Sequence, residues 1–206
     1  MASILDFLDS ETGKQFVESS SKQIGENPEK VKSALGMALP MMLGALKKNA
    51  ASDQGAQSIN KALDDSKHDG SILNRIQDVF QGDNIGNLIN DGSGILGNIF
   101  GGNKDKVEEA VGAATGMDSS KIGSLLKMAA PVVLGILGSQ KRKDQVGAGG
   151  LSGLLGSVMG SDTAHDQSLL ETFMDSDNKN SVIGDVTGKL FGKKGGSKGL
   201  GDFFKG

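Results

Sequence analysis

Apolar residues along this chain recur every three or four positions, the spacing of one face of a helix. The longest such segment follows Asn27-Pro28-Glu29, which combines a capping residue, a proline suited to the first helical position and an early acid. Its apolar positions are Val31, Leu35, Ala38, Leu39, Met42, Leu43 and Leu46. Shorter helices are predicted at 3–8, 14–24, 57–63, 71–80, 104–114, 150–159 and 167–174. No segment alternates in the way strands do, so the pattern predicts an all-α, multi-helical fold.

The long apolar helix occurs twice in the sequence. Residues 31–46 align with residues 122–137, and eight of the sixteen aligned positions are identical. The second helix has a start signal at Asp118 or Ser119. Pro40 and Pro131 align within these segments, and an interior proline removes a backbone hydrogen bond, so both central helices are expected to be kinked. The 91-residue spacing continues on both sides, which predicts two tandem copies of one helical unit.

This repeat defines the expected domain organisation. Unit 1 spans residues 1–93 and unit 2 spans residues 94–184, and we expect them to pack as one domain. Residues 185–206 form a tail rich in glycine and lysine. Within it Gly188–Gly192 matches Gly97–Gly101 at the same spacing, which makes the tail a candidate partial third unit with only an opening helix.

Composition adds to this picture mainly through glycine. The chain has 32 glycines in 206 residues, roughly twice the ~7% of average proteins. Several recur at the repeat spacing, such as Gly25 with Gly116, which predicts helix joints and points of close packing rather than disorder. The chain has no cysteine, which excludes disulfides, thiolate metal sites and thiol nucleophiles.

Charge and hydropathy limit the classes of partner that the protein is expected to bind. The formal net charge of −3 provides no general attraction to nucleic acid, so no nucleic-acid partner is expected. The N-terminal residues lack the basic start of a secretory signal. The longest uncharged apolar runs, 34–46 and 128–137, are shorter than the ~20 residues of a transmembrane helix. We therefore expect buried core helices, no transmembrane segment and, by default, a cytoplasmic location, with non-standard export left open.

Two segments are basic. Lys141-Arg142-Lys143 is interpreted as a solvated loop. The tail carries Lys193, Lys194 and further lysines and ends near Phe203-Phe204. Adjacent phenylalanines on such a tail predict docking on this or another molecule, or peripheral contact with an anionic envelope surface.

Motifs that suggest chemistry are weak in this sequence. Gly92, Gly94 and Gly97 have the spacing of a dinucleotide loop, but residues 86–90 are too short and polar for the strand that must precede it. Residues 175–180 begin like a calcium loop, but Lys179 and Asn180 occupy positions that need an oxygen ligand and a glycine.

Histidine occurs twice, each time before an aspartate. His68-Asp69 and His165-Asp166 could supply a metal ligand or a general base. The alternative, which we favour, is that each aspartate caps the helix that follows it, at Ser71 or Gln167. We therefore expect no catalytic, cofactor-binding or metal site and no cofactor.

Glycine-rich motifs point to a family. They are Gly92-Ser-Gly-Ile-Leu-Gly-Asn-Ile-Phe-Gly101, Thr115-Gly116, Leu125-Leu126, Ala130-Pro-Val-Val-Leu-Gly135 and Gly149-Gly-Leu-Ser-Gly-Leu-Leu-Gly156. Over roughly residues 30–160 the chain resembles the YidB-like family of bacterial proteins, a domain of unknown function. The resemblance implies an all-α domain and a bacterial source, and it transfers no catalytic or binding residue.

Tandem helical copies without a chemical constellation favour a non-enzymatic structural or interaction protein. We expect it to self-associate, with the partial third unit of one copy filling a place in the next, head to tail. The alternative is a small-molecule or lipid-binding module whose apolar cavity is lined by Met37, Met41, Met42 and Met128. An enzyme that uses the two His-Asp pairs is the third hypothesis.

Overall fold

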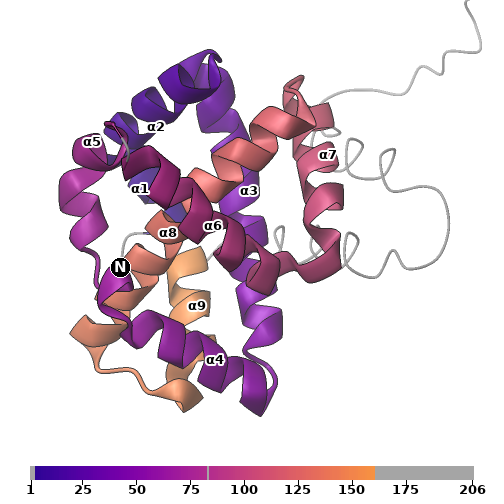
Figure 1. The fold of residues 1–206 in the computed structure, drawn as a ribbon. Helices are drawn as coiled ribbons and strands as arrows, with labels where there is room; N and C mark the ends of the chain where they lie inside the picture. The colour runs from indigo at the N-terminus through magenta and orange to yellow at the C-terminus, as the bar shows by residue number, and fades with distance from the viewer. Residues whose placement is uncertain (1–2, 83, 161–206) are drawn as a thin grey trace, which may run out of the picture.

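The computed structural model describes residues 3–82 and 84–160, and all regular structure within them is helical (Figure 1). The α-helices are α1 (Ile4–Asp9), α2 (Glu11–Ile24), α3 (Pro28–Asn49), α4 (Asp53–Asp64), α5 (Ile76–Val79), α6 (Asn84–Phe100), α7 (Lys104–Thr115), α8 (Ser119–Asp144) and α9 (Leu151–Met159). Short 3₁₀ turns connect them: η1 (Ser66–His68), η2 (Ser71–Arg75), η3 (Gly101–Asn103) and η4 (Ala148–Gly150). The predicted all-α class is confirmed.

Local sequence signals explain where the long helices begin and end. The Asn27 side chain accepts a hydrogen bond from the Glu29 backbone N–H at 2.8 Å, and α3 starts at Pro28 as predicted. Helices α2 and α7 end at Gly25 and Gly116, whose φ angles are +64° and +66°. Only glycine adopts this left-handed conformation without strain, so these two residues are the predicted joints.

The core is built around α3 and α8, which contact each other near the middle of the molecule. Leu35 and Leu43 of α3 are fully buried, as are Leu126 and Leu137 of α8. Pro40 and Pro131 lie inside these helices, and both are buried. Helix α8 is long and apolar enough to cross a membrane by length and composition, but 78% of its most apolar window is buried. It is therefore a core helix, as the pattern predicts.

Each central helix is packed against a shorter helix from the other half of the chain. Helix α4, from the first half, packs on α8, whereas α9, from the second half, packs on α3. Helix α6 crosses α8 (Figure 1). The predicted boundary between the two units, between residues 93 and 94, falls inside this unbroken helix. Neither central helix is covered by its own half alone.

Helix α6 was not among the predicted helices. It contains four glycines and four asparagines in 17 residues, and both residue types disfavour helix interiors. Gly92 explains why the helix tolerates them. A Cβ atom at this residue would lie 1.7 Å from the Lys127 carbonyl oxygen of α8, so only glycine allows the two helices to approach this closely. Gly92 is therefore a close-packing residue of this helix crossing.

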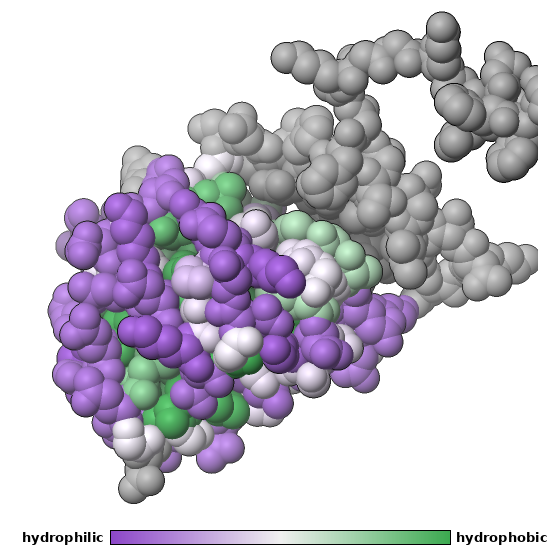
Figure 2. Space-filling view, turned by 90° about the horizontal axis from the view of Figure 1, so that it is seen from above, coloured by the Kyte–Doolittle hydropathy of each residue, from purple (hydrophilic) through white to green (hydrophobic). Residues whose placement is uncertain are grey.

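The face seen in Figure 2 is largely polar, with small separate apolar areas. Among the large apolar side chains of the described residues, only Leu5 is classed as exposed, at 40%. Several predicted features lie outside the described residues: the helix at 167–174, His165, the segment 175–180 and the tail with Phe203 and Phe204.

One ion pair joins the α2–α3 junction to α8. Lys121 Nζ lies 2.8 Å from Glu26 Oε1 and 3.3 Å from the Gly25 carbonyl oxygen. The hydrogen bond from Lys121 lowers the pKa of the Glu26 carboxyl below its ordinary value. A carboxyl with a lowered pKa stabilises the fold fully above the unfolded pKa, and this contribution is lost as pH falls through the folded value.

Glu26→Gln is therefore expected to lower the thermal midpoint at neutral pH. The difference from wild type should shrink as pH falls below the ordinary glutamate pKa of about 4.3. Thermal unfolding followed by circular dichroism from pH 7 to pH 3 measures this, with Glu18→Gln, an exposed glutamate of α2, as the control. A difference that stays constant over this pH range would contradict the assignment.

Candidate functional site

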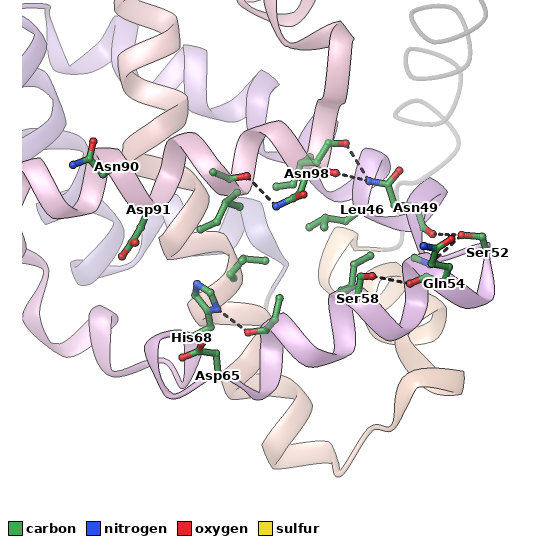
Figure 3. A pocket seen from close by; sticks show the side chains of 17 residues that line it. Leu46, Asn49, Ser52, Gln54, Ser58, Asp65, His68, Asn90, Asp91 and Asn98 are labelled. Atoms are coloured by element: carbon green, nitrogen blue, oxygen red, sulfur yellow. Dashed lines mark hydrogen bonds between the residues drawn. The ribbon is translucent and has the colours of Figure 1, made fainter.

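The main candidate site is an open groove between α4 and α6, with a volume of about 770 Å³ (Figure 3). Its apolar floor comes from α3, α4, α6 and α8: Leu46, Ile59, Ile95, Ile99 and Leu134. Its walls carry mainly amide, hydroxyl and acidic groups: Asn49, Ser52, Gln54, Ser58, Asp65, Asn90, Asp91 and Asn98. We refer to this site as the α4–α6 groove.

Asn49 and Asn98 shape the groove where α3 meets the end of α6. Asn49 Nδ2 donates to the carbonyl oxygens of Asn98 and Ile99, both at 3.1 Å. Asn98 Nδ2 donates to the Gly94 carbonyl at 3.0 Å. These bonds satisfy carbonyls near the C-terminal end of α6 and hold this wall in place.

His68 lies at the opposite end of the groove. Its Nδ1 atom is 2.7 Å from the Ala62 carbonyl oxygen (Figure 3). A carbonyl only accepts, so Nδ1 carries the proton in neutral histidine and Nε2 is left as an acceptor.

The loop that carries His68 is seated on α8. The Gly138 position allows this, because a Cβ there would lie 1.9 Å from the His68 carbonyl oxygen. Arg142 donates to the carbonyl oxygens of His68 and Asp65, both at 3.2 Å. These contacts fix the backbone from which the imidazole projects.

Asp69 stabilises the turn that follows. Its Oδ1 atom accepts a hydrogen bond from the Ser71 backbone N–H at 2.7 Å, but the N-cap residue of η2 is Gly70, so the predicted N-cap at Asp69 is not found. Hydrogen bonds from Ser71 lower the pKa of the Asp69 carboxyl. His68 and Asp69 therefore have separate roles, the first in the groove and the second in the turn.

Two carboxylates accompany His68. Asp65 is the residue that follows α4, and Asp91 projects from α6 toward the loop of His68 (Figure 3). Asp91 is half-exposed and lies 3.8 Å from Lys67 Nζ, whose side chain points mostly into solvent. Asp65 accepts from the Lys67 backbone N–H at 2.9 Å. We refer to Asp65, His68 and Asp91 as the acceptor cluster.

The basic run at residues 141–143 differs from its prediction as a solvated loop. It forms the last turn of α8, where lysine and arginine complement the negative end of the helix dipole. Lys141 is only 8% exposed and pairs with Asp64 of α4. The predicted loop was wrong, because the run is helical and α4 covers Lys141, whereas Arg142 and Lys143 are exposed as predicted.

The other candidate residues are placed mostly in the core. Met42 and Met128 are fully buried, and Met37 and Met41 pack against the core without lining the groove. Gly94 lines the groove, but the suspected dinucleotide motif lies inside α6 and has no strand before it in the described residues. Among these residues no group of three or more acidic, histidine or cysteine side chains could hold a metal ion.

Sequence reasoning missed the groove itself. Its walls come from helices about thirty residues apart, and their relative placement depends on how each packs on α8. The signal that was available is the exposed face of α6, where Asn90, Gly94 and Asn98 follow one another at helical spacing.

Comparison with known proteins gives a family. The model of DUF937, described as a bacterial protein of unknown function, matches residues 6–140. The matched residues include both walls of the α4–α6 groove. YidB is a member of this family, so the resemblance is confirmed. No curated protein and no solved structure matches the chain. The chain belongs to DUF937, a family of bacterial proteins of unknown function.

Proposed function

We propose that this protein is a non-enzymatic interaction protein that self-associates through the α4–α6 groove. One observation carries the proposal: an open groove with an apolar floor and walls of amide, hydroxyl and carboxylate groups. Such a surface suits a polypeptide, because backbone groups find hydrogen-bond partners along the walls while apolar side chains are buried on the floor.

We further propose that the chain contains two tandem copies of one helical unit. In support, α2 and α7 each end at a left-handed glycine and are each followed by a long helix with an interior proline. The packing of α4 on α8 and of α9 on α3 is reciprocal. We also propose that an opening helix within residues 185–206 binds a neighbouring copy, head to tail.

The groove also favours a second candidate function. Its volume of about 770 Å³ falls within the ~300–1,000 Å³ of small-molecule sites. Native mass spectrometry of the purified protein tests this: a co-purified lipid or small molecule supports it, and a mass equal to the bare chain contradicts it. The cytoplasmic location and the peripheral envelope contact of Phe203 and Phe204 remain predictions, which cell fractionation tests.

Self-association is tested by light scattering of the full chain over a range of concentrations. We expect the mass to rise with concentration, and to stay at that of a monomer after deletion of residues 185–206. A full chain that remains monomeric throughout would overturn the proposal.

The groove is tested by filling it. Gly94 lines it, and nothing lies within 4 Å of where its Cβ would be, so the backbone accepts a side chain here and Gly94→Leu adds an apolar group at the groove. We expect this variant to remain folded and to lose self-association. Gly86→Leu is the matched control, because Gly86 is also exposed on α6 with open space around its Cβ but does not line the groove. Equal association of the two variants would exclude the groove.

A further inference from the structure

The acceptor cluster has a defined chemical preference. Asp65 and Asp91 are acceptors when ionised, and the bond from His68 Nδ1 to the Ala62 carbonyl leaves Nε2 as a third acceptor. No lysine or arginine occurs among the residues that line the groove. An ammonium group carries three donors and a positive charge, so a lysine side chain complements this end of the groove.

The rest of the groove adds a second requirement. The floor of the same groove is apolar, with Ile59 of α4, Ile95 of α6 and Leu134 of α8. A ligand that fills both parts must place apolar side chains within a few residues of a lysine, because an extended chain advances only ~3.3 Å per residue.

Residues 189–194 of this chain have that composition. They read Lys-Leu-Phe-Gly-Lys-Lys, an apolar pair flanked by lysines and free of acidic residues. They lie outside the described residues. We propose that this segment of a second copy occupies the α4–α6 groove, with Leu190 and Phe191 on the floor and a flanking lysine in the acceptor cluster.

This inference rests on the proposed self-association and specifies which segment of the second copy binds, residues 189–194. Two cations of the described residues lie beside the cluster: Arg142 binds the backbone carbonyls of Asp65 and His68, and Lys67 pairs with the Asp91 carboxylate. The Lys67 side chain is 67% exposed and its Nζ is 3.8 Å from the carboxylate, so it can turn into solvent when another ammonium approaches. The Lys67–Asp91 pair is weak enough to be exchanged.

The absence of natural cysteine allows a direct test by disulfide cross-linking. One full-length variant carries Gly94→Cys in the groove, and a second carries Leu190→Cys in the segment. Mixing the two under oxidising conditions should produce a heterodimer that peptide mapping assigns to this pair. Gly153→Cys is the matched control, because Gly153 is an exposed glycine of α9 with open space around its Cβ.

The outcomes separate this inference from the proposed function. If the full chain self-associates but Gly94→Cys links no faster than Gly153→Cys, the groove assignment is overturned and self-association stands. Cross-links only within one chain, seen when both substitutions are combined and absent on mixing, also overturn it. A full chain that is monomeric by light scattering removes the proposed function and this inference together.

Charge gives an independent readout. Asp91→Asn should raise the dissociation constant of self-association by up to about fivefold at low salt, which is the effect of a half-exposed ion pair. The increase should fade at high salt, because salt screens the pair. Replacement of Lys189, Lys193 and Lys194 by glutamine should raise the constant by a similar factor, and combination with Asp91→Asn should add little. Fully additive effects would show that these groups do not meet.

Discussion

Replacement of Gly92 by alanine is expected to destabilise the protein by about 3 kcal/mol or more, the upper part of the range for overpacked cores. The added methyl carbon would lie 1.7 Å from the Lys127 carbonyl oxygen and 2.6 Å from its carbonyl carbon. Both atoms are backbone of α8, so no side-chain rotation relieves the clash. Helices α6 and α8 must separate, and their shared packing is then lost along much of α6.

The position of this contact follows from Pro131. A proline lacks an N–H, so the carbonyl four residues earlier, that of Lys127, loses its donor within α8. Gly92 brings the backbone of α6 against this same carbonyl, close enough for a Cα–H to face it. The proline and the glycine therefore belong to one helix crossing.

The control is Gly94, the next glycine on the same helix. Gly94 has open space around its Cβ, so Gly94→Ala is expected to stabilise the protein by up to about 1 kcal/mol through helix propensity. Urea unfolding of both variants measures the two changes. Changes of the same sign would contradict the predicted contact between Gly92 and Lys127.

The second large effect is expected at Asp64. Its carboxylate pairs with Lys141, whose side chain is only 8% exposed, and it also accepts from Asn60 Nδ2 at 3.0 Å. Asp64→Ala leaves the ammonium group of Lys141 buried without this partner. We expect a loss of about 2 kcal/mol, below the ~3–5 kcal/mol of fully buried pairs because Asp64 is half-exposed.

Lys141→Met provides the opposite case. Methionine keeps an unbranched apolar stem as far as Cε, and Asp64, at 55% exposure, can be hydrated when its partner is removed. The loss of stability should therefore be below about 1 kcal/mol. Chemical denaturation of the two variants checks the order, and a Lys141→Met variant that is the less stable of the two would refute it.

The helices that the sequence predicted best are those in which local signals and burial agree. The start of α3 at Asn27-Pro28 and the glycine ends of α2 and α7 follow from residues within one turn. Helix α6 could not be predicted in this way, because its glycines and asparagines disfavour a helix and its stability comes from packing on α8. The groove was harder still to predict from the sequence, because neither of its walls contains a chemical motif.

The exchange of α4 and α9 between the two halves has a consequence for synthesis of the chain on the ribosome. When residues 1–93 have emerged, α3 still lacks α9, and α4 still lacks α8, the helix on which it packs. Burial of α3 is completed only by residues 151–159, at the end of the described chain. Contacts this distant in sequence delay folding, so the nascent first half exposes the apolar face of α3 until residues 151–159 have emerged.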